Sequence, residues 1–284
     1  MKRIILAILL TGMLSGQAYA MDRPMFLDFS LTREQKAIKK VLKQQTRYAK
    51  QMNLEKFIST FDINYVNSDG FDLNTYSNLV NDVWKSYKNI KYELDIQSIS
   101  TKGNQATVNV IEKSVAKLPV NEVFEGKLDS IAECTYYLKK VDGRWRVFSD
   151  KITKETTSML YGEALNLDIK LSAPDEINAN EEYCATLEFI PPDETMAIAS
   201  IAADIIKYPQ TPTKEVFRPL PDDCILERLF TSNDENANEY IVASIGLTKA
   251  AVEDLSLKLS LTGFGYKIKR VNVRPVNNRN DEQI

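Results

Sequence analysis

The spacing of apolar residues changes near Asn89, and this change constrains the fold more than any other feature of the sequence. Before it, apolar residues recur every three or four positions, as on the buried face of an amphipathic helix. A long helix is expected from residue 31 until Asn53 interrupts it, a short one after Asn53, and a third after Asp72, with Asn53 and Asp72 as caps. After Asn89, apolar and polar residues alternate, which is typical of half-buried strands. This order predicts an α+β arrangement in which a curled sheet closes over the long helix.

The strands of this sheet are expected in two pairs. The first pair lies on either side of the turn Lys102-Gly103-Asn104. The second pair, at about 126–140 and 144–154, is joined by Val141-Asp142-Gly143. Asp-Gly is the strongest short signal for a tight β-hairpin, so we expect antiparallel pairing in both cases.

From Leu165 the sequence stays strand-like. Seven short runs of β-type composition follow one another over roughly 110 residues, separated by Pro, Asn, Asp or Gly. This number and spacing predict an immunoglobulin-like sandwich. Both tryptophans, Trp84 and Trp145, lie in the first half, so the core Trp of antibody domains is missing and the prediction depends on the strand pattern alone.

The first half resembles the NTF2-like superfamily, which includes nuclear transport factor 2, ketosteroid isomerase and SnoaL-type proteins. The resemblance is carried by RYAKQMNLEKFISTFDINYVNSDG, a following helix, and then KYELDIQSIS, QATVNVIEKS and CTYYLKKVDGRWRVFSDKI. It covers about residues 30–155 and implies a cone of three helices on a curved antiparallel sheet, with a pocket inside. We therefore expect an α+β NTF2-like domain at 30–157, followed by an all-β immunoglobulin-like sandwich at 165–275.

The first twenty residues have the pattern of a secretory signal peptide. A basic start at Lys2 and Arg3 precedes the apolar stretch Ile4–Leu10, and Ala18-Tyr19-Ala20 has the small residues of a cleavage site. A membrane anchor is the alternative, but a spanning helix needs about 20 apolar residues, and within that length the apolar stretch is followed by Thr11, Gly12, Ser15, Gly16 and Gln17. We expect cleavage after Ala20, a periplasmic or extracellular protein, and a loose tail at 276–284.

The composition excludes several kinds of site. The chain has no histidine, which excludes Ser-His-Asp and Cys-His couples and histidine zinc motifs. Its three cysteines form no CxxC pair, so neither a metal nor another cofactor is expected. Cys184 and Cys224 lie in the same predicted domain and could form a disulfide; the alternative is that all three cysteines are small buried residues.

The charge pattern argues against nucleic acid as a partner. Removal of Lys2 and Arg3 takes the formal charge from −3 to −5, whereas phosphate binding needs clustered cations. A basic series on the first helix is better explained as its solvated face; it consists of Lys36, Lys39, Lys40, Lys43, Arg47 and Lys50.

The resemblance also suggests where an active site would lie. Ketosteroid isomerase combines a helix Tyr and a protonated strand acid with a second Asp as base. Tyr48 lies at the position of the helix Tyr, and Asp69 lies near the base, although Ser68 fits as well. At the position of the strand acid this chain has Cys134, and Glu133 points to the opposite face. The constellation therefore lacks its strongest acid.

Glu112 is a candidate on independent grounds, because it shares the strand phase of the apolar residues Val108 and Val110. A carboxyl in an apolar pocket has a raised pKa and can act as acid or base. The alternatives are that the strand end is solvated or that Lys113 or Arg146 pairs with it. Likewise, Tyr48 could be a core Tyr and Asp69 a turn residue.

The sequence therefore predicts a secreted, non-enzymatic protein that binds a small apolar molecule or an envelope protein. The expected pocket residues are Tyr48, Tyr92, Glu112, Tyr137 and Trp145. One alternative is an isomerase or dehydratase that uses Tyr48 with Asp69 or Glu112, and another is a structural envelope module. Stable membrane insertion is not expected, and a homodimer through the NTF2-like sheet is what the resemblance implies.

Overall fold

The computed structural model describes residues 31–87, 89–120, 124–211, 214–253 and 256–275. The predicted signal peptide and the predicted tail lie outside these residues. The chain divides into two compact units. The first contains the described residues up to Ala116 together with Ser130–Thr153, and the second contains Lys117–Asp129 and the described residues from Lys154 onward. The predicted domain bounds, 30–157 and 165–275, stay a prediction.

The first unit begins with the three predicted helices, which are confirmed together with their caps. They are α1 (Arg33–Lys50), α2 (Leu54–Ile58) and α3 (Leu73–Ser86). The side chain of Asn53 accepts a hydrogen bond from a backbone N–H in the first turn of α2, and Asp72 does the same for α3. These bonds satisfy backbone donors that a helix start otherwise leaves unpaired.

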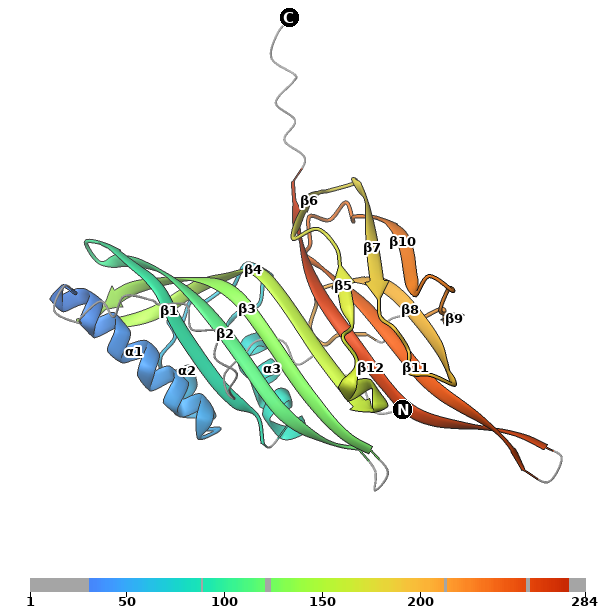
Figure 1. The fold of residues 1–284 in the computed structure, drawn as a ribbon. Coiled ribbons are helices and arrows are strands. Elements are labelled where there is room, and N and C mark those ends of the chain that lie inside the picture. Colours follow the sequence, from blue (N-terminus) through green and yellow to red (C-terminus); the bar gives the residue numbers. More distant parts are fainter. Residues whose placement is uncertain (1–30, 88, 121–123, 212–213, 254–255, 276–284) are drawn as a thin grey trace, which may run out of the picture. The chain divides into compact units, whose positions relative to one another are not determined.

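Four long strands follow the helices, β1 (Lys91–Lys102), β2 (Gln105–Val120), β3 (Phe124–Val141) and β4 (Arg144–Gly162). The first unit contains β1 and those parts of the other three that lie up to Ala116 or within Ser130–Thr153. Figure 1 shows the helices beside these strands. Asp142 and Gly143 both have positive φ, as the predicted tight turn between β3 and β4 requires. Along β3, alternate residues are buried, so one face of this strand lies against the core.

The second unit has two packed sheets. A three-stranded sheet has the order β10-β7-β5, and β12, β11, β8 and β9 follow one another in the other sheet. Their bounds are β5 Lys170–Ser172, β6 Glu176–Asn178, β7 Glu182–Glu188, β8 Thr195–Ile205, β9 Arg218–Pro219, β10 Ile225–Thr231, β11 Glu239–Glu253 and β12 Ser256–Arg274, with a short 3₁₀ helix at Glu163–Asn166. Buried residues of β7, β8, β11 and β12 form the core between the sheets.

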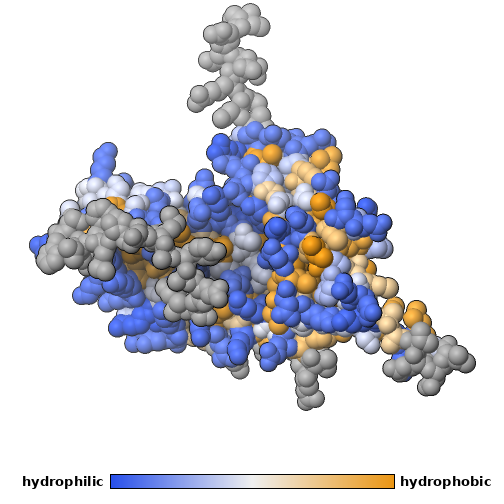
Figure 2. Space-filling model, viewed as in Figure 1, coloured by the Kyte–Doolittle hydropathy of each residue, from blue (hydrophilic) through white to orange (hydrophobic). Residues whose placement is uncertain are grey.

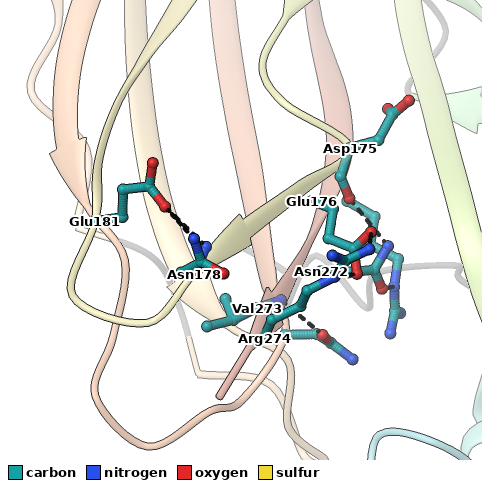
Figure 3. Close-up of polar contacts among 9 residues, drawn as sticks. Asp175, Glu176, Asn178, Glu181, Asn272, Val273 and Arg274 are labelled. Carbon is teal, nitrogen blue, oxygen red and sulfur yellow. Dashed lines mark hydrogen bonds and ion pairs between the residues drawn. The ribbon is translucent and has the colours of Figure 1, made fainter. Parts of the chain in front are cut away.

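Polar contacts hold the short strand β6 in parallel pairing with the end of β12 (Figure 3). Asn272 donates from its backbone N–H, at 3.0 Å, and from its side-chain amide, at 3.1 Å, to the carbonyl of Asp175. Arg274 pairs with the carboxylate of Glu176. Strand β6 is thus attached both by its backbone pairing with β12 and by side chains.

The predicted fold class, an α+β NTF2-like cone followed by a separate immunoglobulin-like sandwich, is wrong. Most described residues lie in strands, with three α-helices among them, and one nine-stranded sheet contains both β1–β4 and the strands β12, β11, β8, β9 and β6. The connection is the pairing of β4 with β12, from Thr156 opposite Lys269 to Gly162 opposite Gly263. Local alternation identifies strands, but it does not specify pairing between strands far apart in the sequence.

The suggested disulfide is also wrong, because Cys184 and Cys224 are free thiols. Strands β7 and β10 pair antiparallel, and Cys184 lies opposite Leu229. Just beyond the ends of these strands, the backbone N–H of Phe189 donates to the carbonyl of Cys224. Five residues along a strand correspond to about 16 Å. A disulfide needs Cα atoms within about 7 Å of each other, so the register keeps the two sulfurs apart.

Candidate functional site

The most unusual buried group of the first unit is the carboxyl of Glu112 on β2. Glu112 is 5% exposed, as its phase with Val108 and Val110 predicts. The hydroxyl of Tyr136, on β3, donates a hydrogen bond to it. Burial raises the pKa of Glu112, and hydrogen bonds from Tyr136 and from the thiol of Cys134 oppose this rise. The neutral form of this carboxyl is therefore less unfavourable in the folded protein than it is in water.

A small cavity adjoins this pair. Its volume is about 20 Å³, and its lining comes from α1, α2 and the sheet: Gln45, Thr46, Ala49, Phe57, Tyr92, Leu94, Glu112 and Tyr136. A water molecule needs at least about 10–15 Å³ of such volume, whereas small-molecule sites usually measure about 300–1,000 Å³. The cavity is thus the size of a single water.

Gln45 is the second unusual group, because it lies within the buried stripe of α1. The stripe consists of Ile38, Leu42, Gln45 and Ala49. Gln45 is 3% exposed, and among the described residues neither the nitrogen nor the oxygen of its amide has a hydrogen-bond partner. An unpaired buried polar group costs about 1–3 kcal/mol. The amide lines the same cavity as Glu112, so a single bound water could bond to both side chains.

Aromatic packing closes the space between the helices and the sheet. Phe57 contacts Phe61, Tyr76 and Trp84, with ring centroids 5.3, 6.4 and 5.7 Å away. Tyr65 lies 5.3 Å from Tyr76 and continues the cluster. Rings at these separations gain specific attraction beyond their buried area. The interior is therefore filled by its own side chains.

A second buried carboxyl–phenol pair lies in this unit. The hydroxyl of Tyr65 donates to the carboxylate of Asp150 on β4. Burial raises the pKa of Tyr65 far above its ordinary value, and the charge of Asp150 adds to the rise. Tyr76 is also buried, and its pKa is raised by burial and by both Asp150 and Glu112. Both phenols therefore stay neutral, and the hydroxyl of Tyr65 acts as a hydrogen-bond donor.

Of the five predicted pocket residues, only Tyr92 and Glu112 line the cavity. Tyr92 accepts a hydrogen bond of 2.8 Å from the indole N–H of Trp84. Tyr48 is half-buried, with the guanidinium of Arg47 over its ring. Tyr137 is half-buried and packs near Phe148, and the indole N–H of Trp145 donates to Glu34. The structure does not bring these three side chains to the cavity.

The other candidates also have structural explanations. The backbone N–H of Asp69 donates to the side chain of Asn67 at 3.0 Å, which is the bond of a turn, and Asp69 does not line the cavity. Arg146, offered above as a partner of Glu112, donates instead to the carbonyls of Ser59 and Phe61. The basic series of α1 lies largely on its exposed side, as expected for a solvated face.

Sequence reasoning missed Gln45 and Tyr136, and both had a signal. Gln45 is a polar residue at an apolar position of a regular helical stripe. Tyr136 is two residues after Cys134, so it shares the inward face on which Cys134 was placed, while Tyr137 must face outward. The choice of Tyr137 was a phase error of one residue.

The site could in principle stabilise negative charge, because a neutral carboxyl beside a phenol can donate hydrogen bonds to an oxyanion. However, the cavity has room for only one water, so a substrate does not fit beside the pair. Metal chemistry has no candidate site in the described ranges, which contain no group of three Cys, Asp or Glu placed to hold an ion.

Comparison with known proteins gives one family match. Residues 40–158, less than half of the chain, match the family described as anti-sigma-I factor RsgI9, C-terminal domain. No curated protein matches the chain by sequence.

Similar solved structures include a protein of the NTF2-like family from Streptomyces avermitilis, with 13% identity and a TM-score of 0.35 over 41% of this chain and 93% of that one. Another is an LEH-like epoxide hydrolase from M. tuberculosis, with 12% identity and a TM-score of 0.29 over 43% and 82%. Bd1075 from Bdellovibrio bacteriovorus has 12% identity and a TM-score of 0.34 over 42% of this chain, which spans 39% of its length. At these scores the neighbours carry no argument about mechanism.

Proposed function

We propose that the chain is an exported, non-enzymatic binding protein whose ligand is another protein. One observation carries the proposal: the cavity beside Glu112 has a volume of about 20 Å³, and its lining residues other than Thr46 and Leu94 are buried. A recognition site for a small molecule would need at least about ten times this volume. Binding is thus assigned to the outer surface.

The family match agrees with this proposal. The matched family is described as a domain of an anti-sigma factor, and that description names no reaction. Export is part of the proposal because of the signal-peptide pattern of residues 1–20. Among the described residues, no helix has the length and apolar character that crossing a membrane requires.

Native mass spectrometry of the protein released from the periplasm tests the proposal. We expect a chain that begins at Met21 and carries no stoichiometric small molecule. Amine cross-linking in intact cells, through exposed lysines of α1, is expected to join the chain to a different polypeptide. A small molecule bound one to one, retained by a Gln44→Leu variant and lost from Gln45→Leu, would overturn the proposal, as would cross-linking that yields only the chain and its own multimers.

A second candidate function is favoured by one observation, the raised pKa of Glu112 next to the Tyr136 hydroxyl. An isomerase or dehydratase would use this pair to hold an oxyanion. The probe is 4-nitrophenol, whose phenolate resembles such an oxyanion and is followed by its absorbance. Saturable binding that Tyr136→Phe weakens at least tenfold supports the enzyme, and the absence of saturable binding up to millimolar probe rejects it.

A further inference from the structure

The hairpin of β11 and β12 extends beyond the strands on either side of it (Figure 1). Pairing of β8 with β11 ends where Thr195 lies opposite Lys249. Pairing of β4 with β12 ends at Gly263. In the part of the chain that the structure describes, the two strands beyond these points form a ladder only with each other, down to Glu253 opposite Ser256. We call residues 250–253 and 256–262 the terminal ribbon.

The end of β4 explains why this edge of β12 is left without a neighbouring strand. Gly162 has a φ of 59°, and a Cβ there would lie 2.4 Å from the carbonyl oxygen of Thr262. Only glycine fits so close to β12 with this backbone. The chain then turns into the 3₁₀ helix Glu163–Asn166, so β4 leaves the sheet at a defined position.

One face of the terminal ribbon is apolar. Leu257, Leu259 and Leu261 alternate along β12 and are 67%, 56% and 50% exposed. Ala250 lies opposite Leu259 on the same face, and Met196, also exposed, lies beside Thr248 at the base. Figure 2 shows apolar surface along this hairpin. Exposed apolar patches of this kind mark interaction surfaces, and an open strand edge is a template for another strand.

We propose that the occupant of this edge is a second copy of the chain, paired antiparallel through residues 256–262 of β12 about a two-fold axis at Leu259. This register places Leu259 opposite its own copy and Leu257 opposite Leu261. All the leucines then share one face of a four-stranded ribbon. Lys258 lies opposite Ser260 on the other face, so no two charges of the same sign meet.

The sequence favours this register over an axis at Lys258. Leucine, serine and lysine alternate in Ser256-Leu257-Lys258-Leu259-Ser260-Leu261, so the segment is self-complementary. An axis at Lys258 would also align leucine with leucine, but it would place the two Lys258 ammonium groups directly opposite each other, which destabilises a sheet. Two-fold pairing of identical patches is the common form of homodimer.

The size of the contact sets its strength. Seven residues from each copy is fewer than the roughly 20–30 residues a side of a standard interface, so the dimer is expected to depend on concentration. This dimer is distinct from the homodimer through the first-half sheet that the resemblance implies. It is also independent of the proposed function, because a protein with or without another partner could form it.

Cysteine cross-linking of the full exported chain tests the register. The background is Cys184→Ser with Cys224→Ser, which leaves only the buried Cys134. Under mild oxidation Leu259→Cys is expected to form a covalent dimer. A mixture of Ser256→Cys with Ser260→Cys keeps Lys258 and would pair only about an axis at Lys258, so it is not expected to form one. A mixture of Lys258→Cys with Ser260→Cys is expected to form the heterodimer. This heterodimer requires that the two β12 strands pair edge to edge. If two ribbons instead stacked through their leucine faces, residues 258 and 260 of the two copies would lie on opposite outer surfaces.

The outcomes that overturn the proposal are distinct. A dimer of Ser256→Cys with Ser260→Cys contradicts the register, and a Leu259→Cys dimer without the product of Lys258→Cys with Ser260→Cys contradicts edge pairing. Sedimentation equilibrium of the chain without added cysteines provides a second measurement. Its average mass is expected to rise toward twice the monomer with concentration. Leu259→Glu is expected to abolish this rise, whereas Leu229→Glu, an equally drastic change at another exposed leucine, keeps it. A chain that stays monomeric at all concentrations overturns the proposal.

Discussion

Replacement of Gln45 by leucine tests whether the cavity is a closed part of the core or a ligand-binding site. Gln45 is buried in α1, and no group in the part of the chain that the structure describes pairs with its amide. Leucine has similar length, fits the apolar stripe, and removes both polar atoms from the cavity. If the cavity is closed, the change should stabilise the unit.

The size of the effect follows from two contributions. Removal of an unpaired buried amide is worth about 1–3 kcal/mol. Leucine also loses about 1 kcal/mol less side-chain entropy than glutamine on folding. One water in the cavity could satisfy only part of the amide, which has two donors and two lone pairs. We therefore expect Gln45→Leu to raise the free energy of unfolding by about 2 kcal/mol.

Urea unfolding followed by tryptophan fluorescence measures the free energy of unfolding of the unit that contains Gln45. The only tryptophans, Trp84 and Trp145, lie in the same unit as Gln45. Gln44→Leu is the matched control, because it makes the same chemical change one position along α1, at a half-exposed residue. The control should change stability by less than about 0.5 kcal/mol.

A loss of stability in Gln45→Leu of 1 kcal/mol or more would refute the reasoning. It would mean that the amide is well paired in solution and that the cavity holds a tightly bound group. The closed-core interpretation, and with it the proposal that binding occurs on the outer surface, would then be abandoned in favour of a ligand site at Glu112.

Three further predictions concern stability. The pKa of Glu112 is raised above its ordinary value of 4.5, so the folded state keeps a proton that the unfolded state releases. The free energy of unfolding should therefore fall as the pH rises above about 4.5. Glu112→Gln should flatten this fall when unfolding is followed by fluorescence at pH 4–8. Asn53→Ala should cost about 1 kcal/mol in the same assay through loss of the α2 cap. Gly162→Ala should lower the far-UV circular dichroism melting temperature much more than Gly143→Ala, because both have positive φ but only Gly162 has backbone in the way of a Cβ.

Features that depend on neighbouring residues could be predicted from the sequence. The caps at Asn53 and Asp72 and the Asp142-Gly143 turn each depend on bonds or backbone angles within four residues. Their chemistry is complete in the local sequence. Most strand positions in the second half were predicted for the same reason, since alternation is a local property.

The sheet arrangement could not be predicted in this way, and the glycines of β12 show why. Glycine is one of the residues expected to separate the strands of the second half, yet Gly263 and Gly265 both lie within the single strand β12. A Cβ at Gly263 would lie 2.7 Å from the backbone of Ala164, and one at Gly265 would lie 2.5 Å from Leu160. These glycines allow close approach of a distant strand. In the sequence, such a glycine cannot be distinguished from one that ends a strand.

The polar residues of the first unit have a physical explanation that needs no reaction. Buried polar groups are costly unless they are paired, and a strand that slips by one residue moves every side chain to the other face. A slip of β3 against β2 would separate Tyr136 from Glu112 and leave a buried carboxyl alone. The pair therefore penalises the wrong register far more than two apolar residues would. The side chains that suggest an active site thus also specify how the long strands align. Because the cavity beside them holds only one water, this structural role explains their burial without a substrate.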